Sequence, residues 1–179
     1  LLWACGFSAS AAPGYTGSNE KVPAPAYEFR AAWVACVYNI DWPSKKGLSA
    51  GQQQAELVRI LERMSALRMN AMIFQVRPQA DTLYRSRIEP WSPWLTGTMG
   101  KDPGYDPLAY CIQQAHARNI EVHAWFNPFR ASPHRDHGVS GDHISRTHPS
   151  IIRDYKLHKW MDPASSFTRR RALDVIADV

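Results

Sequence analysis

Short uninterrupted hydrophobic runs alternate along the chain with longer stretches in which hydrophobic residues recur every three or four positions. The first pattern is typical of a strand that is buried on both faces, and the second of a helix with one buried face. The runs at 29–38, 71–76 and 120–126 therefore predict three buried strands.

Helices are predicted between these strands. Ser49 and Gln52 have the spacing of a capping box, and the helical pattern that follows continues to Asn70. Asp106 and Pro107 are typical of the N-cap and first turn of a second helix. A third amphipathic stretch covers 167–179. The predicted buried stripes of the first two helices are Leu57, Ile60, Leu61, Met64 and Leu67, then Leu108, Cys111, Ile112 and Ala115.

The resulting order, β-α-β-α-β-loop-α, predicts an α/β fold with right-handed crossovers and a parallel sheet, either open and doubly wound or closed as a barrel. No glycine-rich phosphate loop follows the first strand, which argues against a nucleotide-binding oxidoreductase. Polar and aromatic residues instead collect after each strand, which favours a barrel. Because a (β/α)8 barrel takes about 250 residues, we expect an incomplete TIM-like barrel, its N-terminal part.

The first residues predict export. Residues 1–12 resemble the end of a signal peptide, with either an A-x-A cleavage site at Ala9 to Ala11 or a lipobox that ends at a lipidated Cys5. Residues 13–27 are rich in Pro, Gly, Ala and Ser and predict a flexible tether. Residues 28–179 are then a truncated barrel domain in the cell envelope, periplasmic or on an outer-membrane lipoprotein, with membrane contact only through the lipid anchor.

Composition adds limits on the class of partner. The chain has 179 residues, 45% of them hydrophobic, and a formal net charge of +5, which allows attraction to anionic polymers such as wall glycan. No nucleic-acid-binding motif is present, so nucleic acid is not an expected partner. Cys36 and Cys111 lie among apolar residues and are predicted to be buried hydrophobic side chains without a disulfide.

The first two strands are followed by candidate binding residues. Asp41 and Trp42 pair a carboxylate with an indole, as sugar sites do, although they also fit a turn cap and a cover over the barrel rim. Gln75 and Arg77 point to one side of the second strand. Arg77 and Asp81 then form either a structural ion pair or a ligand clamp.

The third strand and the loops add further candidates. His123, Trp125 and Asn127 alternate on one side, and His123 fits either a site or a core histidine bonded to the backbone. A loop with Trp91, Trp94 and Tyr105 is either a glycan platform or a cover over the second helix. The sequence also has a loose group of histidines, His134, His137, His143 and His148. No cysteines or carboxylates complete a ligand set there, so neither a metal nor another cofactor is expected.

Three long segments together resemble the glycosyl hydrolase-like 10 family: EFRAAWVACVYNIDWP, IFQVRPQADTLYRSRIEPWSPWLTGTMGKDPGYDPL and VHAWFNPFR. Within that family they are most similar to bacterial lipoproteins that cleave peptide-free peptidoglycan glycan strands. The resemblance implies a TIM-like barrel. It also implies cleft-lining roles for Gln75, Arg77, His123, Asn127 and Arg130, with Asp41, Asp81 and Asp162 as lesser candidates.

In the family, a paired-aspartate motif follows the segment that ends here at Val179, so the resemblance places the main catalytic residues beyond this chain. Ala164 also stands where the family pattern has a glycine, close after Asp162. We therefore expect a glycoside hydrolase that uses carboxylate acid and base catalysis, with this piece inactive alone. The alternative is a non-catalytic barrel module that binds cell-wall glycan.

Overall fold

The computed structural model describes residues 27–133 and 138–179. The predicted signal remnant at 1–12, the lipidation candidate Cys5, nearly all of the predicted tether and the histidines His134 and His137 lie outside these residues. Within the described ranges, no helix is both long enough and apolar enough to cross a membrane.

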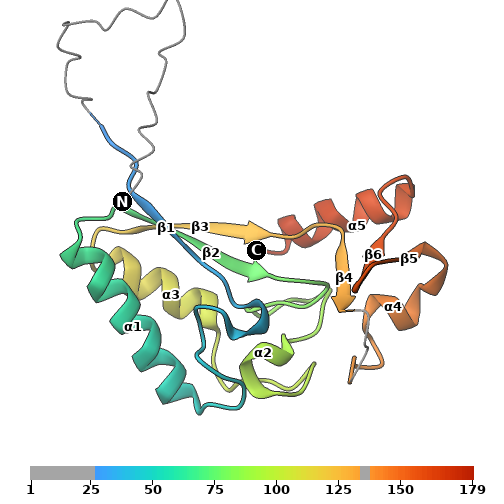
Figure 1. Ribbon diagram of the computed structural model, residues 1–179, viewed down its shortest axis with the longest axis horizontal. Coiled ribbons are helices and arrows are strands. Elements are labelled where there is room, and N and C mark those ends of the chain that lie inside the picture. The colour runs from blue at the N-terminus through green and yellow to red at the C-terminus, as the bar shows by residue number, and fades with distance from the viewer. Residues whose placement is uncertain (1–26, 134–137) are drawn as a thin grey trace, which may run out of the picture.

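The core of the fold is a parallel three-stranded sheet in the order β1-β2-β3, made of β1 (Ala31–Val34), β2 (Ala71–Arg77) and β3 (Glu121–Phe126) (Figure 1). Trp33 lies opposite Ile73, which lies opposite His123. The predicted α/β fold and parallel sheet are therefore confirmed. Across the described residues the sheet does not close into a barrel.

The first strand is shorter than predicted. After Val34 the backbone leaves the sheet and forms the 3-10 turn η1 (Val37–Asn39), in which Tyr38 and Asn39 have positive φ angles of 56° and 53°. A strand cannot continue through such left-handed residues. The apolar residues that prolonged the predicted strand instead enter the core beside it: Ala35, Cys36 and Val37.

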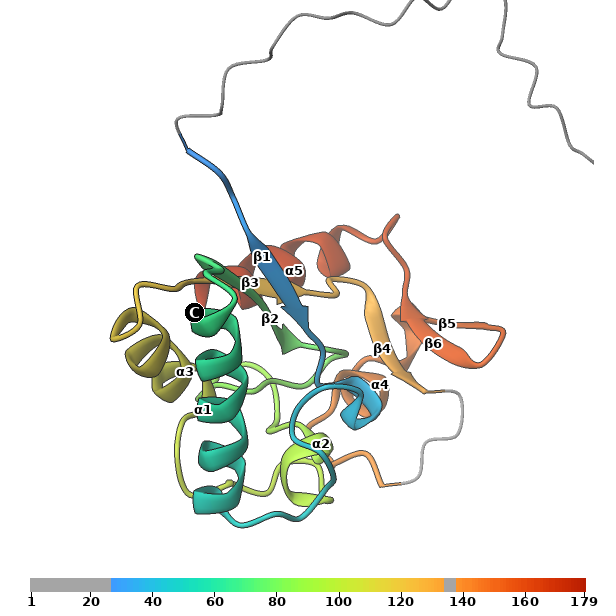
Figure 2. The same ribbon diagram turned by 60° about the vertical axis from the view of Figure 1, so that its left-hand side comes forward.

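Two helices cover one face of this sheet, α1 (Ala50–Ala66) and α3 (Pro107–His116) (Figure 2). The predicted capping box is present: the Ser49 hydroxyl accepts from the Gln52 backbone N–H, and the Gln52 side chain accepts from Ser49 N–H. Asp106 caps α3 through the backbone N–H of Ala109. The buried core between these layers includes Val34, Cys36, Leu57, Leu61, Met72, Phe74, Leu108, Cys111 and Ala115.

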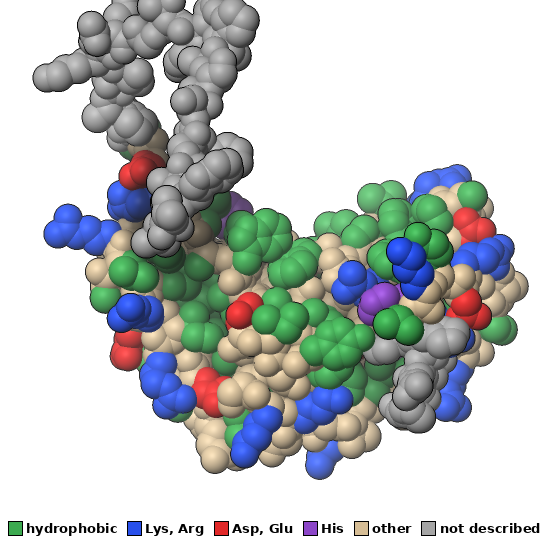
Figure 3. Space-filling model, in the orientation of Figure 1, with side chains coloured by type: hydrophobic (Ala, Val, Ile, Leu, Met, Phe, Trp, Pro, Cys, Tyr) green, Lys and Arg blue, Asp and Glu red, His purple; other side chains and the backbone are tan. Residues whose placement is uncertain are grey.

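The opposite face of the sheet, here called the open face, carries aromatic side chains, of which Phe29, Trp33 and His123 are exposed and Trp125 is half-buried. Trp33 is 60% exposed and Phe29 61%. The rings pair edge to face, with centroids 4.9 Å apart for Trp33 and Trp125 and 5.3 Å for Phe29 and His123. The space-filling view also shows hydrophobic side chains at the molecular surface (Figure 3).

The segment after β3, predicted as a loop, contains a second sheet. Its antiparallel strands have the order β4-β6-β5: β4 (Arg130–Pro133), β6 (His158–Met161) and β5 (Ile152–Tyr155). With α4 (Ile144–Thr147) and η2 (Pro149–Ile151) they form a small lobe around Ala80, Ala131, Ile144 and Met161. Strands of four residues are too short to show a clear hydrophobic period, so this sheet could not be predicted from the sequence.

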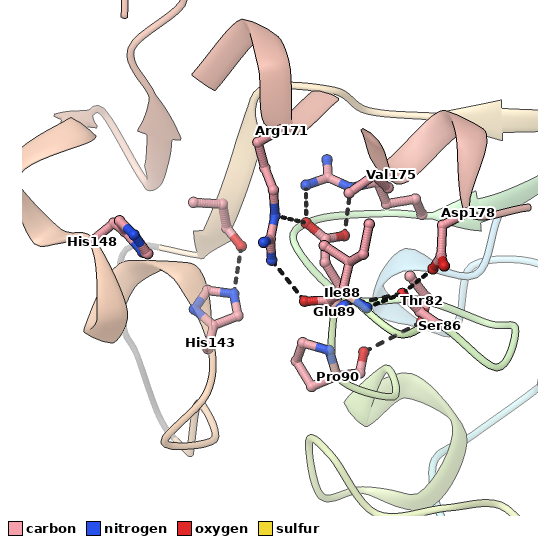
Figure 4. A network of polar contacts seen from close by, with 12 residues as sticks. Thr82, Ser86, Ile88, Glu89, Pro90, His143, His148, Arg171, Val175 and Asp178 are labelled. Atoms are coloured by element: carbon pink, nitrogen blue, oxygen red, sulfur yellow. Dashed lines mark hydrogen bonds and ion pairs between the residues drawn. The ribbon is translucent and has the colours of Figure 1, made fainter. Parts of the chain in front are cut away.

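The last helix, α5 (Ser166–Ala177), matches the predicted third helix and packs against the loop between β2 and α3. That loop also contains the short helix α2 (Pro93–Thr96). Tyr84 Oη donates to Val175 O at 3.1 Å. Ser86 Oγ donates to Asp178 Oδ2 at 2.5 Å (Figure 4). The two longest segments between elements of the main fold follow the carboxyl ends of β2 and β3. Both therefore begin at the same end of the parallel strands.

Candidate functional site

The carboxyl ends of the three parallel strands meet at one edge of the sheet, and Gln75 ties the first two together. Its Oε1 accepts hydrogen bonds from the backbone N–H groups of Cys36 and Val37, both at 3.0 Å. The Gln75 side chain is 1% exposed. Gln75 therefore holds the loop after β1 in place and is not open to a ligand in this structure.

Arg77, the last residue of β2, lies in a buried ion pair. Its Nη2 lies 2.7 Å from Glu89 Oε1 and its Nε donates to Glu89 Oε2 at 2.7 Å. Its Nη1 donates to the backbone oxygen of Asn127. The predicted pairing with Asp81 is thus wrong, because Glu89 forms the bidentate contact along the Nε–Nη2 edge of the guanidinium and Nη1 is bonded to Asn127.

Glu89 was missed from the sequence, because it lies in an irregular loop twelve positions after its partner. It is 6% exposed, and Arg171 Nε from α5 lies 3.8 Å from its Oε1 (Figure 4). One carboxylate therefore joins β2 to α5. The one sequence signal is that Arg85 and Arg87 lie on the same loop as Glu89. Basic residues close in sequence indicate that this carboxylate has a partner, but they do not identify Arg77.

Asp81 is fully buried and anchors the loop after β2. Its Oδ1 accepts from the Gln79 backbone N–H at 3.1 Å, and its Oδ2 accepts from Ser92 Oγ at 3.0 Å. Burial raises the pKa of Asp81 to about 7, against the opposing effect of the Ser92 hydrogen bond. A carboxyl group with such a pKa can exchange a proton near neutral pH, although here both oxygens are occupied by the protein.

Asn127 connects β3 to β2. Its Oδ1 accepts from Trp125 Nε1 at 3.0 Å, its Nδ2 donates to Pro78 O at 2.8 Å, and its backbone N–H donates to Arg77 O at 3.0 Å. His123 lies further back in the strand, exposed on the open face, with Nε2 3.5 Å from Glu121 Oε2. The structure therefore brings Asn127 and Arg77 together and leaves His123 apart from them.

Asp41 and Trp42 do not act as a pair. Asp41 is exposed, and its Oδ2 accepts from the Ala35 backbone N–H at 2.8 Å, as expected of a turn cap. Trp42 is 0% exposed, donates from Nε1 to Gln53 O at 2.9 Å and packs against Phe74. A sugar cannot reach its ring, so the structure favours the alternative of a cover over the core.

Asp41 also lines a cavity of about 480 Å³ outside the sheet, between β1 and the outer side of α1. This cavity contains no other predicted site residue, and its walls include Ile60, Met64, Leu67 and Met69. It lies away from the carboxyl ends of β2 and β3. We therefore do not assign chemistry to it.

Most of the predicted aromatic platform belongs to the core. Trp94 is 7% exposed and lies under Lys46 Nζ, 4.2 Å from the ring centroid. Trp91 packs half-buried against the main core, and Tyr105 Oη donates to Gln53 Oε1 at 3.0 Å. Tyr105 also packs edge to face on Tyr110 of α3, in line with the alternative of a cover over the second helix, whereas Trp94 packs on Tyr38 after β1.

Arg130 and Asp162 lie in the small lobe. Arg130 starts β4 with its Cζ 5.4 Å from the ring centroid of Trp160, an aromatic residue that the sequence did not single out. Asp162 Oδ2 lies 3.0 Å from Arg153 Nη2, and its Oδ1 accepts from the Ala164 backbone N–H. Asp162 is thus paired with residues of the lobe itself, whereas Arg130 lines a cavity.

The described histidines of the loose group have structural contacts. His143 caps α4, with Nδ1 accepting from the Ser145 backbone N–H and Nε2 3.2 Å from Ala131 O. His148 stacks on Phe167 with centroids 4.4 Å apart. Among residues 27–133 and 138–179, no three His, Cys, Asp or Glu side chains are grouped so as to hold a metal ion.

Comparison with known proteins places this arrangement in a family. A family model described as glycosyl hydrolase-like 10 matches residues 28–172. Glycosyl hydrolase YngK of Bacillus subtilis (strain 168) is 52% identical over 130 residues, covering 72% of this chain and 26% of YngK. Glycosyl hydrolase DigH of Escherichia coli (strain K12) is 33% identical over 165 residues, covering 86% of this chain and 35% of DigH.

The chain therefore spans about a quarter to a third of the length of these curated relatives. The match to the family model includes all three parallel strands and the small lobe. This chain belongs to the glycosyl hydrolase-like 10 family, as its three long sequence segments led us to expect.

Proposed function

We propose that this chain is the N-terminal part of an exported (β/α)8-barrel glycoside hydrolase that cleaves peptide-free glycan strands of peptidoglycan. The observation that carries the proposal is the meeting of Arg77 and Asn127 at the carboxyl ends of adjacent parallel strands. Active sites of (β/α)8 barrels are built at this end of the strands. Family membership and relatives named as glycosyl hydrolases supply the reaction class.

The open face supports the barrel part of the proposal. Parallel sheets are almost always covered on both faces, yet Trp33 is 60% exposed here. In a closed barrel the same face points inward and packs against the remaining strands. Since the relatives are about three to four times longer than the matched region, a longer protein has residues enough for those strands.

The buried carboxylates support placing catalysis elsewhere in the longer protein. Glycoside hydrolysis generally needs two carboxyl groups that flank the bond, one as acid and one as base or nucleophile. Asp81 and Glu89 are buried and bonded on both oxygens, so neither reaches a substrate in this structure. In our proposal, residues beyond Val179 supply the acid and base, and this chain supplies part of the cleft.

The net charge of +5 suits a polyanionic substrate in the cell envelope. Peptidoglycan strands without stem peptides carry one free carboxylate on every second sugar. A basic surface raises the local concentration of such a polymer, and the effect weakens as salt is added.

The proposal is tested by digesting purified peptide-free glycan strands with this 179-residue chain and, separately, with the full-length protein. Released sugars are identified by mass spectrometry, and intact peptidoglycan with its peptides is the matched control substrate. We expect products from peptide-free strands with the full-length protein only.

Strands that are bound but not cleaved by either protein would instead establish a glycan-binding module. Products released by the 179-residue chain itself would show that its own carboxylates suffice, and would overturn the assignment of the acid and base to residues beyond Val179.

A further inference from the structure

A small cavity lies where β3 runs into the small lobe. It has a volume of about 100 Å³ and is lined by Asn127, Pro128, Phe129, Arg130 and Trp160. We call it the Arg130 pocket. Arg130 and Trp160 are direct partners across the antiparallel pair of β4 and β6, so the lobe's backbone fixes the two side chains beside one another.

Among residues 27–133 and 138–179, the Arg130 guanidinium has no partner of opposite charge. Its Nε is buried without a hydrogen bond, and no hydrogen bond or ion pair joins the guanidinium to the described part of the chain. The Trp160 ring lies beside it, with Cζ 5.4 Å from the centroid. Burial and then the charge of Arg130 lower the pKa of His158, which packs edge-on against the same ring.

The described acidic residues on and next to β5 and β6 are paired with other side chains. Asp154 is paired with Lys159 at 3.1 Å, and Asp162 with Arg153 at 3.0 Å. Arg77, by contrast, has its guanidinium satisfied by Glu89 on two nitrogens. A partly buried guanidinium without an anion is costly, so this arrangement points to a partner that comes from outside the described residues.

The polar groups of the pocket define the class of that partner. Trp160 Nε1 is also buried without an acceptor, and both arginine and tryptophan side chains are donors only. The amide of Asn127 is taken up by Trp125 and Pro78. The pocket therefore offers donors and no free side-chain acceptor, which suits an anion such as a planar carboxylate, whose two oxygens match the guanidinium fork.

The size of the pocket sets how much of a ligand it holds. Sites for drug-sized ligands measure roughly 300–1,000 Å³, so 100 Å³ accommodates a substituent rather than a whole disaccharide. The aromatic walls, Phe129 and Trp160, suit the CH faces of a sugar ring that carries this substituent. The pocket therefore has room for only part of a larger ligand.

We infer that the Arg130 pocket binds the free carboxylate of an acidic sugar, namely the 3-O-lactyl group of N-acetylmuramic acid in a peptide-free strand. This inference rests on the proposed function. In intact peptidoglycan the same carboxyl group is joined to the peptide as an amide and has no charge. The pocket therefore gives a physical reason for selecting strands from which the peptides have been removed, because only these present the anion to Arg130.

The test compares three sugars for binding to this chain by calorimetry: a peptide-free glycan tetrasaccharide, its carboxyl methyl ester, and a tetrasaccharide of N-acetylglucosamine alone. We expect the acid to bind at least about tenfold more tightly than the ester and the neutral sugar. Arg130→Gln removes this preference and Arg130→Lys retains part of it. The control Arg146→Gln, an exposed arginine of the same lobe, leaves it unchanged.

The outcomes separate the two claims. Equal affinity for acid and ester, or an unchanged preference in Arg130→Gln, overturns the subsite while the glycan function stands. If none of the three sugars binds and the full-length protein releases no products from glycan strands, the proposed function fails and the subsite fails with it. Comparison of acid with ester on the unmodified chain decides the question even if a variant does not fold.

Discussion

Arg77 and Glu89 form a bidentate ion pair, with Nη2 to Oε1 and Nε to Oε2 both at 2.7 Å and both side chains 1% exposed. Arg77 is the last residue of β2, and Glu89 also contacts Arg171 on α5. The pair therefore fixes a loop and a helix at the edge of the sheet where the candidate site lies.

Removing one partner of this pair should be strongly destabilising. In Glu89→Ala the Arg77 guanidinium keeps its buried position without its carboxylate, and we expect the free energy of unfolding to fall by about 3–5 kcal/mol. Urea denaturation followed by circular dichroism measures the loss. The matched control is Glu28→Ala, whose pair with Arg30 is about half exposed and is worth less than about 1 kcal/mol. Equal losses in the two variants would show that Glu89 is not buried as described.

Asp81 should make stability depend on pH. Its pKa is raised from 3.8 to about 7 in the folded state. The contribution of Asp81 to the free energy of unfolding is therefore fully present below about pH 4, and it is lost as the pH rises through 7, because only the unfolded chain ionises easily in that range. At about 1.4 kcal/mol for each pKa unit, the loss is on the order of 4 kcal/mol. Asp81→Asn does not titrate, so its stability relative to the unmodified chain should rise from about pH 5 to about pH 8.

Chemical denaturation of both proteins at the two pH values measures this difference. Asp41→Asn, an exposed carboxylate at a turn, serves as the control and should show a much smaller change. A difference between Asp81→Asn and the unmodified chain that stays constant with pH would mean that the Asp81 carboxyl is ionised throughout this range.

Tyr84 should hold α5 on the body of the protein. Tyr84→Phe removes the hydrogen bond from Oη to the Val175 carbonyl, a loss of about 0.5–1.5 kcal/mol, and keeps the ring in the core. We expect faster amide hydrogen exchange in α5, with little change in α1. Tyr155→Phe is the control, since Tyr155 is 61% exposed. Unchanged exchange in α5 would show that its other contacts suffice to hold it.

Trp33 should report whether the open face is covered in the longer protein. In this chain the ring is 60% exposed and pairs with Trp125, so Trp33→Ala should cost only about 1 kcal/mol. In the proposed closed barrel the same substitution leaves a core cavity and should cost about 3–5 kcal/mol. Thermal unfolding of both lengths gives the comparison. A small cost in both would mean that the open face remains exposed in the full protein.

Several elements could be predicted because their cause is local. Ser49 with Gln52, and Asp106 with Pro107, cap α1 and α3 through atoms two or three residues away, so the sequence alone identified both helix starts. The run at 71–76 matched β2 because a strand buried in a parallel sheet is apolar throughout. The run at 120–126 matched β3 in position, although Glu121, His123 and Ala124 of that strand are exposed here and not buried as predicted. The family could also be identified from the order of its segments.

The burial and the partners of individual polar side chains could not be predicted, because they depend on contacts that are not local in sequence. Nothing in the sequence distinguishes Asp81 from Glu89 as a partner for Arg77, since the choice depends on how the loop after β2 folds back over the strand end. Trp42 and Asp41 are adjacent in sequence, yet one turns into the core and the other caps a turn outside it. Likewise, the pairing of Arg130 with Trp160 needs two four-residue strands that show no period of their own.

The sequence by itself therefore determined the three long helices, the strands β2 and β3, the parallel arrangement of the main sheet and the family, because capping, hydrophobic period and connection length act over a few residues. Tertiary structure alone decided which side chains are buried, which carboxylate neutralises Arg77, and which arginine faces a cavity without an anion. These depend on contacts between residues distant in sequence, where burial and the cost of an unpaired charge select the partners.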